Sequence, residues 1–324
     1  MAEQVVLGID VAKETLDVVV QVGQAKSYGQ FDNNTSGFNQ LRGWLMKANV
    51  KVGRACLEAT GIYGDALAMY LHETGWVVHV VNPARISAYA KSQMKRAKTD
   101  RIDAYLIADY AARHELPVWH PPSPQQQRLR EFIRHIENLK TLRETEVKRL
   151  ATVSDPVVRA SSEQLIAFVG QQIEALIQQM QDHIDQYPEL GDDQDLLDSI
   201  PGIGPWTAAR LIAEIPDIER FNSAKELVAY AGLNPTVFVS GTSVRGQSRI
   251  SKMGNAHIRD ALYMVAWSAK QHDPRMRAFY EGLVARGKCK QVAVVAVMRK
   301  LLHLVYAILT SRTPFDPNYA SSGA

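Results

Sequence analysis

The sequence predicts an α/β domain at the start of the chain and α-helical regions after it. Near the N-terminus, apolar and polar residues alternate in short runs with a two-residue period, which is typical of half-buried strands. Between these runs, apolar residues recur at three- and four-residue steps, as on one face of a helix. Beyond a group of prolines, long stretches have only the helical spacing.

The α/β domain is predicted to begin with a hairpin. Residues 5–10 and 15–22 have strand periodicity, the short link 11–14 joins them, and a third strand is expected around 27–31. The later elements are expected to be a helix at 37–48, a buried strand at 52–57, a helix at 63–74, a strand at 76–81 and a helix from about 100 to 114. This order, βββαβαβα, is that of an RNase H-like domain.

Prolines within residues 117–124 are expected to end this domain. Residues 125–152 and 161–187 have helical apolar spacing and dense polar faces, which predicts a long helical hairpin or coiled coil for oligomerisation, with its turn at Asp155-Pro156. The helices expected after it are 206–215, 224–231, 256–271, 274–285 and 290–309, whereas residues 235–254 lack helical spacing. The predicted domains are therefore 1–122, 123–190 and 191–324.

Composition excludes several classes of protein. Hydrophobic residues make up 46% and charged residues 22% of the 324 residues, which is typical of a globular chain and not of a disordered one. Only Cys56 and Cys289 are present, so we expect neither a disulfide framework nor a cysteine zinc cluster, and a reducing, cytoplasmic setting. No signal peptide is expected, because the N-terminus lacks a basic region followed by an apolar stretch. No membrane is expected either, because no apolar run approaches the roughly 20 residues that cross a bilayer.

Charge is distributed unevenly, although the net charge is only +3. Residues 235–312 contain 13 Lys and Arg residues against 3 Asp and Glu residues, and residues 182–198 contain 7 acidic residues and no Lys or Arg. A basic region behind an acidic stretch indicates a module that binds a polyanion. A solvated basic surface would have the same composition.

Four carboxylates stand at the ends of elements in the α/β domain. Asp10 ends the first strand and Glu58 a later one, where burying an acid without a partner is costly. Asp100 and Asp103 share one face of the last helix because they are three residues apart. The alternatives are a turn residue at Asp10 and helix capping by the aspartate pair. Together the four acids favour a Mg²⁺ (or Mn²⁺) site, because Mg²⁺ takes oxygen ligands and two such ions can flank a phosphodiester.

The segments around these acids, and others near the C-terminus, resemble a known family. The N-terminal segments are GIDVAK at 8–13, LEATG at 57–61, Asn82-Pro83 and KTDRIDA at 98–104. The C-terminal segments are SIPGIG at 199–204, YAGL at 230–233, SGTSVRG at 240–246 and RISKMGN at 249–255. In this order and over nearly the whole chain, they are similar to the DEDD transposases of the insertion-sequence one-ten family, whose N-terminal domain is a RuvC-like nuclease.

The resemblance implies that the carboxylates bind metal while a serine of the C-terminal transposase domain forms a covalent bond with DNA. The family's Ser-Gly motif falls on Ser240. No histidine lies within ten residues of Ser240, so metal from the N-terminal site, of the same or another protomer, is the expected activator. A loop serine in a turn is the alternative. Rival nucleophiles are Ser243, Ser248 and Ser251.

Contacts with nucleic acid are expected at three places. Gly202 and Gly204 belong to a segment that resembles a helix-hairpin-helix turn, whose backbone amides can hold a DNA phosphate, although a tight turn between helices would look the same. The basic residues expected to contact phosphates are Lys95, Arg96 and Lys98 before the aspartate pair, and Arg245, Arg249 and Lys252 in the glycine-rich loop. Surface charge is the alternative for each.

The family also implies the partners. These are donor and target DNA, a structured non-coding guide (bridge) RNA that pairs with both, and further copies of the chain as a dimer or tetramer, in the cytoplasm and at the nucleoid when active. Base pairing with a guide would explain how a chain without a base-reading motif selects its sites.

The predicted function is therefore a transposase or DNA recombinase. Three alternatives are a structure-specific nuclease that uses water and leaves Ser240 incidental, an actin-like ATPase, and a non-catalytic scaffold that bridges DNA. The ATPase requires a second glycine-rich phosphate loop, and residues 58–61 are a poor one.

Overall fold

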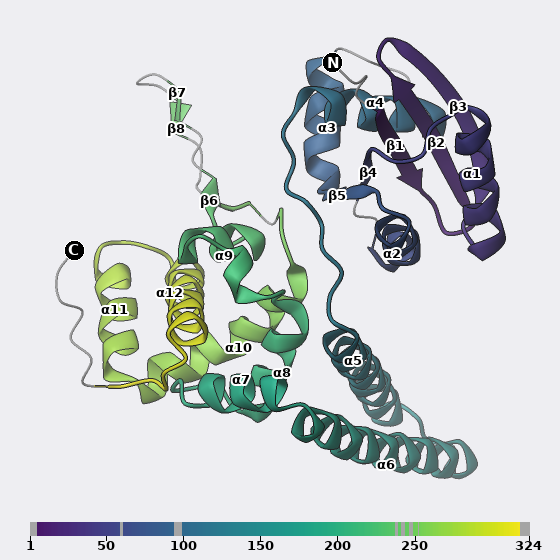
Figure 1. The fold of residues 1–324 in the computed structure, drawn as a ribbon. Coiled ribbons are helices and arrows are strands. Elements are labelled where there is room, and N and C mark those ends of the chain that lie inside the picture. Colours follow the sequence, from purple (N-terminus) through teal and green to yellow (C-terminus); the bar gives the residue numbers. More distant parts are fainter. Residues whose placement is uncertain are drawn as a thin grey trace. The chain divides into compact units, whose positions relative to one another are not determined.

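The computed structural model describes residues 5–58, 61–93, 99–236, 239–240, 244–245, 249–251 and 253–317. The chain forms two compact units, Met1–Pro121 and Pro122–Ala324, which are labelled by element in Figure 1. The N-terminal unit contains both strands and helices, and the C-terminal unit is mostly helical. The α/β and helical parts of the fold-class prediction are thus confirmed.

The N-terminal unit is built on one five-stranded mixed sheet. Its strands are β1 (Val5–Val11), β2 (Thr15–Val22), β3 (Ala25–Asp32), β4 (Arg54–Glu58) and β5 (Val77–Val81). They lie in the order β3-β2-β1-β4-β5. The β1–β2 and β2–β3 pairs are antiparallel, whereas β4 is parallel to both β1 and β5. Asp10 and Glu58 are consequently at the carboxyl ends of adjacent parallel strands.

Helices cover both faces of this sheet. They are α1 (Thr35–Lys47), the 3-10 helix η1 (Gly61–Gly64), α2 (Asp65–Glu73), α3 (Pro83–Ser92) and α4 (Asp100–Arg113). Leu7 and Ile9 of β1 share a buried cluster with Leu41 of α1 and Leu71 of α2. Alternate residues face the other way, where Val6 packs with residues of α3 and α4.

Helix α3 was not among the predicted elements, because Pro83 was interpreted only as the end of a strand. Proline is favoured at the first position of a helix, where its missing N–H has no partner to lose. The Asn82 side chain caps this helix by accepting a hydrogen bond of 2.8 Å from the Ala84 backbone N–H. Asn82-Pro83 is therefore both the end of β5 and the start of α3.

Helix α4 lies unusually close to the sheet at Gly8. A β-carbon added at Gly8 would stand 2.2 Å from the backbone nitrogen of Ala108 and 2.6 Å from the carbonyl oxygen of Ala104. Only glycine on the strand permits this approach. It brings the first turn of α4, with Asp100 and Asp103, toward the face of β1 that carries Asp10.

The C-terminal unit starts with a long pair of helices, α5 (Pro124–Leu150) and α6 (Pro156–Gln186), which pack against each other. Asp155 caps α6 and Pro156 takes its first position, so the turn lies just before the predicted Asp155-Pro156 and the helix starts earlier than the predicted 161. The other elements are α7 (Pro188–Asp198), α8 (Pro205–Glu214), η2 (Ile218–Arg220), α9 (Ala224–Tyr230), α10 (Ala256–His272), α11 (Pro274–Ala285) and α12 (Lys290–Ser311). The acidic stretch, residues 182–198, is helical apart from Tyr187, because it spans the end of α6 and all of α7.

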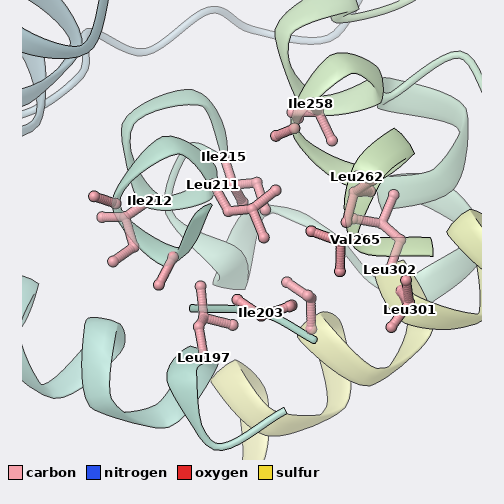
Figure 2. Close-up of a cluster of buried hydrophobic side chains, with 14 of the residues drawn as sticks. Leu197, Ile203, Leu211, Ile212, Ile215, Ile258, Leu262, Val265, Leu301 and Leu302 are labelled. Atoms are coloured by element: carbon pink, nitrogen blue, oxygen red, sulfur yellow. The ribbon is translucent and has the colours of Figure 1, made fainter. Parts of the chain in front are cut away.

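A single apolar core joins these helices. Figure 2 shows Leu197 of α7, Leu211 of α8, Leu262 of α10 and Leu301 of α12 meeting in it. Helix α12 has a mean hydropathy of 2.0 over its best 18-residue window, so by length and composition alone it is able to cross a membrane. The expectation that no apolar run approaches this length was wrong. Half of that window is buried inside the unit, as in the core helix of a globular fold.

The residues described between α9 and α10 form four two-residue strands. They are β6 (Pro235–Thr236), β7 (Val239–Ser240), β8 (Val244–Arg245) and β9 (Arg249–Ile250). β6 pairs with β9 and β7 with β8, both antiparallel. We call this segment, residues 235–251, the serine arm.

Candidate active site

Asp10 lies on the face of the sheet that α4 covers. Its neighbours Ile9 and Val11 point into the opposite core, so Asp10 shares its face with Gly8. Its partner across the β1–β2 ladder is Asp17. Two carboxylates therefore stand side by side on adjacent strands, an arrangement that like charges oppose.

The surroundings of Asp10 disfavour its charge. The pKa of Asp10 is raised from 3.8 to about 6. Burial is the largest cause, followed in order of size by the negative charges of Glu58, Asp103, Asp100 and Asp17. Glu58, Asp100 and Asp103 thus all lie within electrostatic range of Asp10. Asp17 is a fifth acid beside them.

Glu58 reaches this point from β4. Leu57 is the partner of Ile9 in the parallel ladder, so Glu58 follows at the level of Asp10. Parallel strands present their carboxyl ends at one edge, where ligands bind in open α/β sheets. Glu58 is half-buried.

Asp100 and Asp103 occupy the first turn of α4. The helix is capped by Thr99, whose hydroxyl accepts a hydrogen bond of 3.3 Å from the Ile102 backbone N–H. The capping alternative for Asp100 is thus wrong, since the cap is the residue before it. Asp100 is exposed and Asp103 half-buried, and both also benefit from the positive end of the helix dipole.

The donor set and the charge suit a hard divalent cation, which takes carboxylate oxygens and would offset the repulsion at Asp10. Within the described ranges, no three Asp, Glu, His or Cys side chains stand close enough to hold a metal ion as they are placed. The acids interact at electrostatic range and not at coordination range. The metal site therefore stays a prediction.

Asp17 and its partners were missed by the sequence analysis. Asp17 is only 3% exposed and accepts hydrogen bonds from the Tyr28 hydroxyl at 2.5 Å and from the Gln30 side-chain amide at 3.3 Å. One signal for it was present, because Asp17 interrupts the apolar strand 15–22 as Asp10 interrupts its own. The partners on β3 follow only from the pairing register.

Ser240 lies on β7 of the serine arm, opposite Val244. Arg245 is opposite Val239, and Arg249 is opposite Thr236 at the base of the arm. Ser240 and Arg245 thus lie in one two-stranded sheet, and Arg249 lies in another. Other candidates lie outside the described residues, namely Lys95, Arg96, Lys98, Lys252, Ser243 and Ser248.

The base of the serine arm is held by hydrogen bonds and close backbone contacts. The rival Ser251 is tied here, because its hydroxyl donates to the Gly232 carbonyl oxygen at 3.3 Å. A β-carbon at Gly254 would stand 2.3 Å from the Tyr230 carbonyl oxygen, so glycine is required there too. Arg259 donates to the Gly254 carbonyl oxygen at 2.9 Å. These contacts hold the described residues beside the arm, Gly232 and Gly254, and Ser251 at its end, against the helical part of the C-terminal unit.

Gly202 and Gly204 lie in the turn between α7 and α8. Gly202 has a φ of +94°, which favours glycine, and Gly204 is the residue before the first turn of α8. Ile200 and Ile203 are buried beneath the turn. The turn fits both a phosphate site at the α8 N-terminus and a tight connection between helices.

Comparison with known proteins covers both units. Residues 7–155 match a family model described as "Transposase", and residues 194–281 match one described as "Transposase IS116/IS110/IS902 family". The chain is 35% identical over 313 residues to the pilin gene-inverting protein of Moraxella bovis, across 96% of this chain and 97% of that protein. It is 22% identical to the transposase for insertion sequence element IS1111A of Coxiella burnetii, across 96% of this chain and 91% of that protein.

Proposed function

The chain belongs to the IS116/IS110/IS902 family of transposases, and from this premise we propose how it acts on DNA. It excises and inserts its mobile element by metal-dependent cleavage and exchange of DNA strands, through a covalent bond between Ser240 and DNA. One observation carries the proposal: burial, together with the negative charges of Glu58 from β4 and of Asp103 and Asp100 from α4, raises the pKa of Asp10 on β1 to about 6.

The metal ligands are Asp10, Glu58, Asp100 and Asp103. A bound Mg²⁺ or Mn²⁺ would neutralise the phosphoryl group and lower the pKa of an attacking hydroxyl. The sheet order β3-β2-β1-β4-β5, with acids at the ends of β1 and β4, supports an RNase H-like, RuvC-like domain around these ligands.

Ser240 supplies the nucleophile. Its oxygen forms a bond to phosphorus, the bond from phosphorus to the leaving deoxyribose oxygen breaks, and that oxygen takes up the proton which the serine loses. A hydroxyl of a second strand then bonds to the phosphorus and releases Ser240, which regains a proton. Because the phosphoserine keeps the energy of the broken phosphodiester, rejoining needs no ATP.

A nuclease that uses water is not favoured. The relatives in Moraxella bovis and Moraxella lacunata are named for inverting a pilin gene, and an inversion requires cut strands to be rejoined. Donor and target DNA are accordingly the proposed substrates, with phosphate contacts at Arg245, Arg249 and the turn before α8. A guide RNA, assembly through α5 and α6, and a cytoplasmic location complete the proposal.

The test is the covalent adduct. The wild-type chain, with Mg²⁺, its element RNA and a DNA carrying an element end, should form an adduct that survives a denaturing gel. Ser240→Ala should remove the adduct and leave DNA binding near normal, because the hydroxyl is small and uncharged. Cleavage without any adduct in the wild type would establish the water-using nuclease, and an adduct mapped to Ser251 by mass spectrometry would refute the choice of serine.

A further inference from the structure

Arg101 occupies a position that helix stability does not explain. It lies in the first turn of α4, between Asp100 and Asp103, and is exposed. A cation there opposes the helix dipole, whose N-terminal end is positive. The ion pairs found in the described part of the chain include none that involves Arg101.

Two aromatic rings hold the guanidinium instead. The Arg101 Cζ atom is 4.7 Å from the centre of the Tyr28 ring and 5.9 Å from that of Tyr105. Both rings pack on the small apolar cluster of Val19, Ala104 and Ala108, by which α4 rests on the sheet. Stacking on a ring face is a favourable contact for a guanidinium. It uses the flat face of the group, so the N–H donors at the edge of the guanidinium are not taken up by the ring.

The ring of Tyr28 is fixed in turn by Asp17. The Tyr28 hydroxyl donates to the Asp17 carboxylate at 2.5 Å. This hydrogen bond, with burial, raises the pKa of Tyr28 to about 12, so the hydroxyl remains a donor at neutral pH. Gln30 donates to the same carboxylate. Asp17 thereby acts through Tyr28 on the position of Arg101.

This line of side chains borders the acid cluster without neutralising it. Asp17 is the ladder partner of Asp10. None of the ion pairs found in the described residues joins Arg101 to Asp10. The guanidinium is therefore placed beside the cluster by aromatic stacking and not by pairing with Asp10.

We infer that Arg101 binds a phosphate of the DNA strand that enters the acid cluster, and that Asp17 and Tyr28 are positioning residues for it. The planar guanidinium offers parallel N–H donors to two phosphate oxygens, which a lysine does not. A cation at this point also lowers the repulsion between the carboxylates and an incoming polyanion. This inference rests on the proposed function, because it assigns the substrate contact of the same site.

The experiment measures binding and cleavage separately. Binding of a fluorescein-labelled single-stranded DNA is followed by anisotropy from low to high salt, and cleavage of a DNA carrying an element end gives kcat and KM with Mg²⁺. Arg101→Gln should lower the slope of log affinity against log salt by about 0.7 and raise KM several-fold more than it changes kcat. Arg101→Lys should keep the slope, since it keeps the charge, but still raise KM.

Arg113→Gln is the matched control, because Arg113 is exposed in the last turn of the same helix and pairs with Asp109. It should match the wild type in both readouts. Tyr28→Phe keeps the ring but loses the bond to Asp17, and should raise KM less than Arg101→Gln does. A salt slope and KM of Arg101→Gln equal to those of Arg113→Gln would overturn the inference.

The two proposals fail differently. If Asp10→Asn cuts DNA as well as the wild type, the proposed metal-dependent function is wrong, whatever Arg101 does. If Asp10→Asn is inactive while Arg101→Gln is unchanged in salt slope and KM, only the role of Arg101 is wrong. Should Arg101→Gln melt well below the wild type, Arg101→Lys decides, because it preserves the charge and the stem.

Discussion

Asp10 carries a charge that the N-terminal unit destabilises. Its folded pKa is raised from 3.8 to about 6, so at pH 7 the folded carboxylate is charged at a cost that the unfolded chain does not bear. A structural acid would have the opposite shift, because stabilising partners lower a carboxyl pKa. The residue thus weakens the fold in the absence of a cation, which is a common property of functional carboxylates.

We therefore predict that Asp10→Asn melts at the same temperature as the wild type or higher. Adding Mg²⁺ should raise the melting temperature of the wild type, since a ligand present at about 100 times its Kd stabilises the fold by about 2.7 kcal/mol. Asp10→Asn should lose this response. Differential scanning calorimetry measures both effects, with the exposed Glu73→Gln as control. A large fall in melting temperature for Asp10→Asn would make Asp10 structural.

His79 makes the same unit sensitive to acid. It is 3% exposed on β5, where its Nδ1 lies 2.9 Å from the Pro117 carbonyl oxygen and the Arg54 Nε donates to its Nε2 at 3.4 Å. Burial, with the nearby charge of Arg54, lowers the pKa of His79 below its ordinary 6.5. Between the folded pKa and 6.5, His79 is consequently protonated in the unfolded chain and neutral in the folded unit.

The free energy of unfolding should therefore be unaffected by His79 above pH 6.5. It should decline as the pH falls below 6.5 toward the folded pKa of His79. His79→Gln should flatten this decline, because glutamine has no proton to gain. Melting temperatures between pH 7.5 and 5 measure it, with His272→Gln, an exposed residue of α10, as control. Equal slopes for His79→Gln and the wild type would contradict the assignment.

At the scale of single residues, the sequence was informative where a polar side chain interrupts an apolar run. Asp10 and Glu58 were found in this way, and Asp17 had the same signal. Tyr28 and Gln30 had none, because their role depends on the pairing of β2 with β3 in one register. The support of a site depends on tertiary pairing that local spacing does not encode.

Elements were predictable when their periodicity was long and their ends were marked. Helix α11, Pro274–Ala285, was predicted with its observed bounds, between an Asp-Pro start and a glycine that follows. Helices α3 and α7 were not predicted. Both begin with a proline, which marks a helix start as readily as a strand end, and the polar residues of α7 obscure its apolar face.

The approach of α4 to β1 gives a prediction for a whole element. Gly8→Ala would place a methyl group 2.2 Å from the Ala108 backbone nitrogen, so α4 must move away. We expect a loss of about 1–3 kcal/mol in stability, as for other overpacked sites, and a weaker Mg²⁺ response because Asp100 and Asp103 move with the helix. Urea unfolding with and without Mg²⁺ measures both.

Gly64→Ala is the control, since a β-carbon there meets nothing within 4 Å. It should leave both quantities unchanged. If Gly8→Ala were as stable as Gly64→Ala and kept the Mg²⁺ response, the close packing of α4 would not matter for the acid cluster.

Glu214 joins three elements of the C-terminal unit. This residue is 3% exposed at the end of α8 and forms an ion pair of 3.3 Å with Arg134 of α5. It also accepts a hydrogen bond of 2.8 Å from the side-chain amide of Asn255, the cap of α10. Asn255 follows the base of the serine arm. The long hairpin and the arm are thus tied to one buried carboxylate.

Arg134→Ala should destabilise the C-terminal unit by about 3 kcal/mol, because it leaves a buried charge without its cation. Arg149→Ala removes the ion pair of an exposed arginine with Glu146, which keeps its hydrogen bond from Ser162, and should cost about 1 kcal/mol or less. Urea unfolding compares the two variants. Equal losses would mean that Glu214 is satisfied without Arg134.

For the whole molecule, the central fact is that the acids and Ser240 belong to different units of the chain. The acids were predicted from local signals in the sequence, whereas Ser240 was predicted only from the resemblance to the family's Ser-Gly motif. A reaction that uses both must bring them together, within one chain or between two. Recombination must also hold at least two cleaved strands, which favours an assembly of several copies.

We expect the acids of one copy to serve the serine of another. Co-expressed Asp10→Asn and Ser240→Ala chains should then form a covalent DNA adduct, although each alone forms none. In a mixed dimer one of the two sites would have both intact acids and an intact serine, so random pairing should give about one quarter of the wild-type adduct. A size tag on one chain shows which copy carries the DNA, and it should be the Asp10→Asn copy, which keeps Ser240. Light scattering should give more than one protomer for the active complex. Mixed assemblies that form no adduct would show that each chain uses its own acids.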